Sequence, residues 1–137
     1  MMLAVIDTNV LVSALITHNS NAATVKVLKH LFLSHITPLY NEEIIEEYDE
    51  VLHRKKFKLA EEQIRIVLDF VRQNGINSSR CSYNGIMPDE DDRVFYEVSL
   101  SEDSSFLVTG NLKHFPCTPK VITAAKMVEP KSVIRPK

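Results

Sequence analysis

Short apolar runs alternate along the chain with segments in which apolar residues recur every three or four positions. The runs have the length and composition of buried strands and lie at residues 3–6, 35–40, 105–109 and 120–122, with a weaker one at 76–83. Helical periodicity is found between them, at residues 10–16, 21–32, 42–53, 61–74 and 89–100. The alternation predicts an α/β fold, a three-layer α/β/α domain whose central parallel sheet has about five strands.

Residues with strong preferences for helix ends support these boundaries. Ser20 or Asn21 is expected to cap the second helix, and Asn41 to cap the third. Thr123 is expected to cap a short helical turn near the end of the chain. Gly75 is expected to stop the helix over residues 61–74. These signals place the helix ends independently of the apolar periodicity.

The composition is that of one ordinary globular domain, with 45% apolar and 25% charged residues among 137. We expect residues 1–129 to form the domain and residues 130–137 to form a short tail. We expect neither a signal peptide nor a membrane span, which needs roughly 18 consecutive apolar residues. Two cysteines are too few for a disulfide framework, so the expected location is cytoplasmic. The net charge of −2 argues against nucleic-acid binding through overall charge, but a local basic patch with a bound metal would still allow it.

Polar residues occur where two of the predicted strands end. Asp7 directly follows the first strand, and Thr109 and Asn111 follow a later one. Because the carboxyl ends of parallel strands meet at the same edge of a sheet, these side chains are expected to lie close together. An ionised carboxylate in that crevice is unfavourable unless a cation or backbone N–H groups compensate it. Asp7 also has a plainer explanation, since aspartate is a preferred N-cap for the helix that follows it.

Two further segments bring acids to the same edge. The acidic run over residues 89–92 opens a helix, where its charges would also complement the helix dipole. The helix over residues 42–53 adds several acids, of which one is expected to point to the edge: Glu43, Glu46, Glu47 or Asp49. Clusters of carboxylates suit Mg²⁺ or Mn²⁺ rather than zinc. Such an ion removes the repulsion between the acids and assists phosphodiester hydrolysis.

Four segments of the chain carry, in order, the motifs of a known family. They are VIDTNVLVSAL (residues 5–15), EEYDEVL (46–52) with Lys56-Phe57, PDEDDRVF (88–95) and LVTGNLKHF (107–115). In these segments the sequence resembles PIN-domain nucleases, in particular the branch of toxins from toxin–antitoxin pairs. Each motif is weak alone, but the order of all four over about residues 3–128 makes the resemblance specific.

The resemblance implies a metal-dependent endoribonuclease and assigns roles to particular residues. The acids that would hold Mg²⁺ or Mn²⁺ are Asp7, Glu47 and Asp92, with Asp89 as an auxiliary acid and Asn9 and Thr109 as hydrogen-bonding support. The sequence departs from the family at Asn111, where a fourth aspartate is more common. An asparagine offers a carbonyl oxygen without charge, so Asn111 would be a weak ligand. Whether one or two ions bind is therefore open.

The same resemblance implies partners. RNA is the expected substrate, with DNA left open, and a homodimer and an antitoxin protein are the implied protein partners. The candidates for substrate contact are Arg54, Lys55, Lys113 and His114. The basic stretch over residues 53–58 has an equally good structural explanation, since cations at a helix C-terminus complement its dipole.

Two other functions stay open from the sequence. An aspartyl-phosphate phosphotransferase also places an aspartate after its first strand, but its chemistry needs a second acid where this chain has Asn9. The other is a degenerate PIN domain that serves as a non-catalytic RNA-binding or assembly module, and Asn111 keeps this alternative open. A metal-binding assay separates it from the nuclease, because a degenerate site would hold neither Mg²⁺ nor Mn²⁺ tightly.

Overall fold

The computed structural model describes residues 2–129, which form a five-stranded parallel sheet flanked by helices. The sheet order is β3-β2-β1-β4-β5, so the first strand of the chain lies in the middle. The strands are β1 (Met2–Ile6), β2 (Ile36–Tyr40), β3 (Ile76–Asn77), β4 (Phe106–Val108) and β5 (Val121–Ile122). The predicted three-layer α/β/α fold is confirmed.

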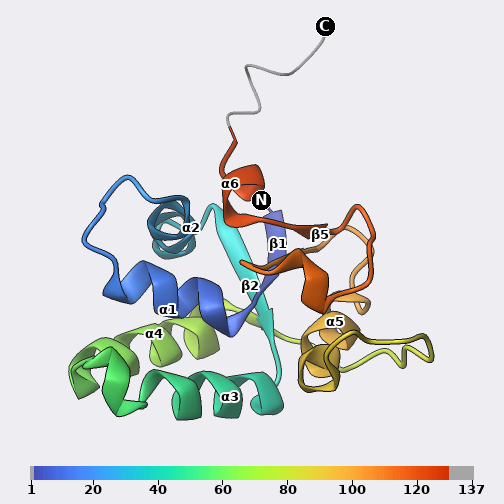
Figure 1. The fold of residues 1–137 in the computed structure, drawn as a ribbon, viewed down its shortest axis with the longest axis horizontal. Helices are drawn as coiled ribbons and strands as arrows, with labels where there is room; N and C mark the ends of the chain where they lie inside the picture. Colours follow the sequence, from blue (N-terminus) through green and yellow to red (C-terminus); the bar gives the residue numbers. More distant parts are fainter. Residues whose placement is uncertain (1, 130–137) are drawn as a thin grey trace, which may run out of the picture.

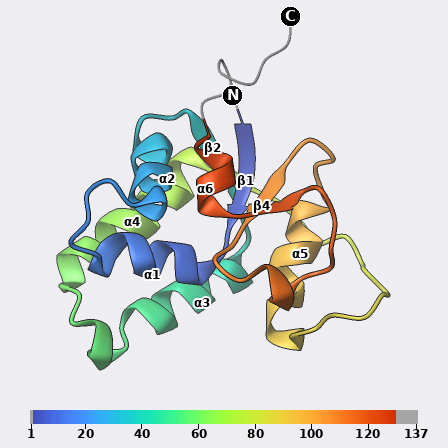
Figure 2. The ribbon, with the colours of Figure 1, turned by 45° about the horizontal axis from the view of Figure 1, so that its top comes forward.

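The helices lie on both sides of this sheet. They are α1 (Thr8–Ile16), α2 (Ala23–Phe32), α3 (Glu42–Leu52), α4 (Glu61–Asn74), α5 (Arg93–Ser99) and α6 (Ala124–Met127), with short 3₁₀ helices η1 (Lys55–Phe57), η2 (Glu90–Asp92) and η3 (Leu112–His114). Figures 1 and 2 show α1 to α4 on one side of β1 and β2, and α5 on the other. None of the helices over residues 2–129 is long and apolar enough to cross a membrane.

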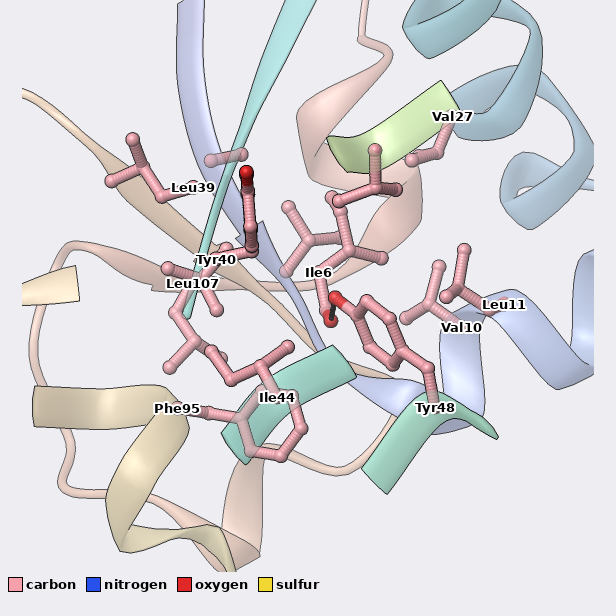
Figure 3. Close-up of a cluster of buried hydrophobic side chains, with 14 of the residues drawn as sticks. Ile6, Val10, Leu11, Val27, Leu39, Tyr40, Ile44, Tyr48, Phe95 and Leu107 are labelled. Carbon is pink, nitrogen blue, oxygen red and sulfur yellow. Dashed lines mark hydrogen bonds between the residues drawn. The ribbon is translucent and has the colours of Figure 1, made fainter. Parts of the chain in front are cut away.

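The core lies between the central strands and the helices that pack on them. Ile6, Leu39 and Leu107 come from the strands and are fully buried, and Tyr48 of α3 is buried beside them (Figure 3). Burying an apolar side chain of this size stabilises the fold by about 2 kcal/mol. The hydroxyl of Tyr48 donates a 2.5 Å hydrogen bond to the carbonyl of Ile6, so the buried ring leaves no polar group unpaired. This bond ties α3 to the carboxyl end of β1.

The caps predicted for α3 and α6 are present, whereas the one predicted for α2 is not. Asn41 accepts a 2.9 Å hydrogen bond from the backbone of Ile44, and Thr123 caps α6 in the same way. The α2 helix begins after Ala22 instead of after Ser20 or Asn21. The reason is a local turn, because the side chain of Asn19 accepts a 2.9 Å bond from the backbone N–H of Asn21. That bond engages Asn21 as a donor in the turn.

The segment after α4 is mostly loop, so the strand predicted over residues 76–83 is wrong beyond its first two residues, Ile76–Asn77. Gly75 does end α4, and the position needs a glycine because a Cβ there would lie 2.6 Å from the carbonyl oxygen of Pro38. After β3 the N–H of Ser78 still donates to the carbonyl of Tyr40 at the end of β2, and the backbone beyond it bonds to α5. The N–H of Cys81 donates to the carbonyl of Glu97, and the N–H of Tyr83 donates to its carboxylate. The tail predicted over residues 130–137 lies outside the described residues.

Candidate functional site

The site begins where β1 and β4 end side by side. The two strands pair with Ile6 opposite Val108, so the next residues, Asp7 and Thr109, emerge together at the carboxyl edge of the sheet. The hydroxyl of Thr109 donates a 2.7 Å hydrogen bond to Oδ2 of Asp7. Both residues are buried, so this bond holds the carboxylate in one orientation. Parallel pairing thus brings together two residues that are 102 positions apart.

Asn9 fixes the loop that follows β4. Its side-chain oxygen accepts a 3.1 Å hydrogen bond from the backbone N–H of Gly110. A Cβ at Gly110 would lie 3.3 Å from that oxygen, so glycine eases the close approach. The N–H of Asn111 in turn donates a 3.0 Å bond to the hydroxyl of Thr109. Asn9 and Thr109 therefore join the start of α1 to the end of β4, and their role in catalysis stays a prediction.

Among the glutamates of α3, Glu47 is the one that borders the cavity beside Asp7. Glu46 is exposed and does not line this cavity. Glu43 lies one turn before Glu47 and is bound by Arg80 at 3.0 Å. The tyrosine bond to the end of β1 described above holds α3 in this position. The geometry therefore favours Glu47 among the acids that the sequence left open.

Asp89 and Asp92 enter the site from the turn before α5. Oδ1 of Asp89 accepts a 3.1 Å hydrogen bond from the N–H of Asp91, so Asp89 caps the short helix η2. The carboxylate of Asp92 makes no capping bond and borders the cavity with Asp7. Asp91 also borders the cavity but is largely exposed. Capping of a helix start thus explains part of the role of Asp89. It does not explain Asp92, whose side chain caps no helix.

A histidine completes this group of side chains. Nδ1 of His114, in η3, lies 3.2 Å from Oδ2 of Asp92 and 3.9 Å from Oδ2 of Asp89. On the other side of the ring, Nε2 lies 2.9 Å from the amide nitrogen of Asn111. Donor atoms of Asp89, Asp92 and His114 all lie within 4.8 Å of one another.

The sequence identified His114 as a candidate for substrate contact only, because the pattern of a loop does not show which way a ring points. The one available signal was the spacing of Asn111 and His114, which places the two side chains on the same face of a single helical turn.

These side chains border one open cavity of about 320 Å³. One part of its wall is acidic and carries the aspartates and Glu47. The rest of the lining includes Val12, Val51, Phe57 and Arg54. Of the four predicted substrate contacts, Arg54 and His114 border this cavity, whereas Lys55 and Lys113 are exposed and do not line it.

The acids of the cavity disfavour one another's charged forms. Burial raises the pKa of Asp92 to about 7, and the charges of Asp7 and Asp89 add to that shift. Burial also raises the pKa of Asp7, against the lowering effect of its bond from Thr109. The pKa of Glu47 is raised as well, first by burial. Within residues 2–129, no lysine or arginine forms a salt bridge with Asp7, Glu47 or Asp92.

These carboxylates suit a divalent cation, and among the described residues the donor atoms that lie close enough to share one ion are those of Asp89, Asp92 and His114, with Asp7 and Glu47 bordering the same cavity. Carboxylate oxygens are the ligands that Mg²⁺ and Mn²⁺ take, and a cation among them would remove the repulsion that raises their pKa values. The side chain of Asn111 is directed to His114 in this arrangement, so its predicted role as a weak ligand stays a prediction.

A parallel sheet that gathers acids at its carboxyl edge suits an α/β enzyme that binds a metal ion there. The family model of the PIN domain matches residues 4–113, which is most of the chain. The chain therefore belongs to the PIN-domain family. PIN domains are generally nucleases that use divalent metals, so membership indicates a hydrolytic nuclease. No match to the chain was found among curated proteins or among solved structures.

Proposed function

We propose that the protein is a divalent-metal-dependent ribonuclease that hydrolyses phosphodiester bonds with Mg²⁺ or Mn²⁺. The observation that carries the proposal is the convergence of Asp7, Glu47 and Asp92 on one cavity, without a lysine or arginine in a salt bridge with them among residues 2–129. Family membership supports the nuclease class. The donor set supports the choice of metal, and the choice of RNA rests on the resemblance of the motifs.

The chain's own residues orient the groups that would hold the cation. Those groups are the carboxylates of Asp7, Glu47 and Asp92, with Asp89 beside them. When bound, a divalent cation makes a water molecule more acidic and stabilises negative charge on a phosphoryl oxygen. Thr109 keeps the carboxylate of Asp7 in one orientation, and Asn9 keeps the β4 loop next to it. The acids thus hold the ion and do not act as nucleophiles.

The remaining wall of the cavity is suited to the substrate strand. Arg54 borders the cavity and is about half exposed, so its guanidinium is accessible although it pairs with Glu50 at 3.3 Å. It would contact a phosphate next to the scissile bond. Lys55 and Lys113 lie outside the cavity, where they would contact phosphates further along the strand.

The proposal extends to a biological setting that rests on the resemblance alone. The protein would be a cytoplasmic homodimer and the toxin of a toxin–antitoxin pair. Growth arrest on expression of the active protein, and none on expression of an inactive variant, would support the toxin role. Sedimentation of the purified protein tests the dimer.

The decisive experiment incubates the purified protein with labelled single-stranded RNA and DNA in Mn²⁺, in Mg²⁺ or in EDTA. It compares the wild type with Asp7→Asn and with a matched control, Asp69→Asn, an exposed aspartate of α4 that does not border the cavity. Metal-dependent cleavage that is lost only in Asp7→Asn supports the proposal, and the preferred strand names the substrate. Cleavage that survives Asp7→Asn contradicts it. No cleavage by folded wild type favours the non-catalytic RNA-binding module.

A further inference from the structure

We propose that His114 is a nitrogen ligand of the metal centre, and that Asn111 positions it by accepting the other N–H of its ring. The inference rests on the metal dependence proposed above and adds a ligand that the acidic motifs do not contain. His114 lies in the last of the four motifs, but the resemblance gave it only as a candidate for substrate contact. The ligand role is inferred from the geometry of this chain.

The ring of His114 is placed between a metal-binding group and a fixed hydrogen-bond partner. Nδ1 faces the carboxylates of Asp92 and Asp89 at 3.2 and 3.9 Å, a spacing from which all three donor atoms can reach one ion. Nε2 faces the side-chain amide of Asn111 at 2.9 Å. The backbone N–H of His114 also donates a 3.1 Å bond to the carbonyl of Asn111. The turn over residues 111–114 therefore joins Asn111 and His114 through both their side chains and their backbones.

The orientation of the Asn111 amide decides which ring nitrogen has a free electron pair. With its NH₂ group toward Nε2, the amide donates, and the ring proton lies on Nδ1, from which it can bond to Asp92. Rotation of the amide by half a turn presents its oxygen at the same position, because the two ends of the amide have nearly the same shape. Nε2 then carries the proton and donates it to Asn111.

The second orientation is the one that a metal ion selects. The ring stays neutral, since one proton leaves Nδ1 to solvent and another joins Nε2 from solvent. The free electron pair of Nδ1 then faces Asp89 and Asp92. Histidines that bind metals almost always donate their other N–H to an oxygen, and the oxygen of Asn111 is in place to accept it. An asparagine at position 111 thus does what a ligand's hydrogen-bond partner does in other metal sites.

A nitrogen ligand changes which ion the site prefers. Mg²⁺ takes oxygen ligands, whereas imidazole nitrogen is a ligand for first-row transition ions. We therefore expect the protein to bind Mn²⁺ more tightly than Mg²⁺, and expect this preference to depend on His114. Loss of the ligand should reduce the affinity for Mn²⁺ by about 10- to 100-fold, and should change the affinity for Mg²⁺ much less.

The test is pulsed electron paramagnetic resonance of the full chain loaded with Mn²⁺, which detects ¹⁴N nuclei bound to the ion. We expect a nitrogen signal in the wild type, none in His114→Ala, and an unchanged signal in His18→Ala, which removes an exposed histidine outside the cavity. Titration calorimetry with Mn²⁺ and with Mg²⁺ on the same proteins measures the change in preference. Circular dichroism shows whether each variant is folded.

Variants of Asn111 separate positioning from mere packing. Asn111→Asp keeps an oxygen that accepts the N–H of His114, so the nitrogen signal should persist. Asn111→Leu has a similar size but no acceptor, and should lose affinity for Mn²⁺ by about tenfold. Equal Mn²⁺ affinity and equal nitrogen signals in the two variants would overturn the role of Asn111.

The outcomes for His114 distinguish the two proposals. Mn²⁺ that binds to the wild type without a nitrogen signal overturns this inference and leaves the ribonuclease proposal standing. A folded wild type that binds Mg²⁺ but not Mn²⁺ overturns this inference alone, and one that binds neither ion overturns both.

Discussion

Two groups of charged side chains lie next to each other in this protein and differ in their partners. The first group, the site acids, consists of Asp7, Glu47, Asp89 and Asp92. The second, the arginine network, consists of Arg80, Arg93, Glu43, Glu90 and Glu97. The site acids have no arginine or lysine in a salt bridge among residues 2–129, whereas every glutamate of the network has one.

The arginine network satisfies its charges internally. Arg80 binds Glu97 at 2.8 Å and Glu43 at 3.0 Å, and the N–H of Tyr83 donates a 2.9 Å bond to Glu97. These contacts lower the pKa of Glu97, the bond from Tyr83 having the largest effect. The hydrogen bond from Arg93 lowers the pKa of Glu90 in the same way. Burial and mutual repulsion shift the pKa values of Asp7 and Asp92 in the opposite direction.

The same helices supply both groups. Glu43 and Glu47 lie one turn apart on α3, and of the two only Glu43 forms a salt bridge with an arginine. Asp92 and Glu97 lie at the start and in the middle of α5, and only Glu97 does. The loop that carries Arg80 thus pairs with Glu43 and Glu97, and leaves Glu47 and Asp92 without an arginine in a salt bridge. By binding α5, the network also fixes the chain just before Asp89.

The comparison is tested most strongly by removing the same charge from two neighbouring acids. Glu47→Gln should lower metal-dependent cleavage by at least about a hundredfold, because even the hydrogen-bond partners of metal ligands contribute up to that much. Glu43→Gln should keep most of the activity. The measurement is the initial rate of RNA cleavage in Mn²⁺, with both variants at equal concentration. Equal losses of cleavage activity in the two variants would contradict the comparison, because the arginine partner of Glu43 would then make no difference to its role.

Removal of a network acid should instead reduce stability. Glu97→Gln leaves Arg80 without its buried partner and weakens the bond from Tyr83, so the free energy of unfolding should fall by about 2 kcal/mol. Urea denaturation at neutral pH in EDTA measures this difference. Glu102→Gln is the control, because it removes the same charge at an exposed position, and its stability should match that of the wild type. An unchanged urea midpoint for Glu97→Gln would contradict a structural role for the arginine network.

The two groups should give stability opposite dependences on pH. The folded protein raises the pKa of Asp92 from 3.8 to about 7, so its contribution to stability is present below pH 4 and is lost as the pH rises through 7. Glu97 has a lowered pKa, so its contribution is lost as the pH falls below that of the free side chain.

In EDTA, Asp92→Asn should therefore become more stable than the wild type between pH 4 and 7. The gain should reach about 2 kcal/mol after allowance for solvent screening. Thermal unfolding of both proteins across this range measures it, and parallel curves would contradict the assignment.

The smallest effect is expected at the exposed rim of the network. Glu90 is largely exposed and pairs with Arg93 three positions away, an interaction that solvent screens. Arg93 also donates to the carbonyls of Tyr83 and Gly85, so it keeps its position without Glu90. Glu90→Gln should leave the urea midpoint unchanged. A measurable loss of stability would mean that Glu90 and the buried Glu97 stabilise the protein together, and would contradict the expectation that the exposed pair contributes little.

The regular parts of this molecule could be predicted from sequence because their signals are local. The apolar runs of β1, β2 and β4 and the periodicity of α3 and α4 depend on neighbouring residues only. Asn41 and Thr123 were identifiable as caps for the same reason. The meeting of Asp7 and Thr109 followed from a general rule about parallel sheets, although the bond between them depends on the register of β1 and β4.

The irregular parts could not be predicted because their partners are distant. The loop after β3 is held by Glu97, and nothing in the pattern of residues 78–88 indicates an acceptor on α5. The choice of Glu47 among the acids of α3 depends on which of their side chains faces the cavity beside Asp7. The contact of His114 with Asp92 depends on the orientation of a ring. These features are set by side-chain geometry, to which hydrophobic periodicity is insensitive.

The central claim is that the site acids lack arginine partners because a divalent cation is their partner. Thermal unfolding of the wild type, Asp92→Asn and Glu97→Gln with increasing Mn²⁺ tests it most directly. The wild type and Glu97→Gln should gain stability with metal, by about 2.7 kcal/mol at a concentration one hundred times the dissociation constant. Asp92→Asn should start higher in EDTA and gain little. A wild type that is indifferent to Mn²⁺, or an Asp92→Asn variant that gains as much, would contradict the claim.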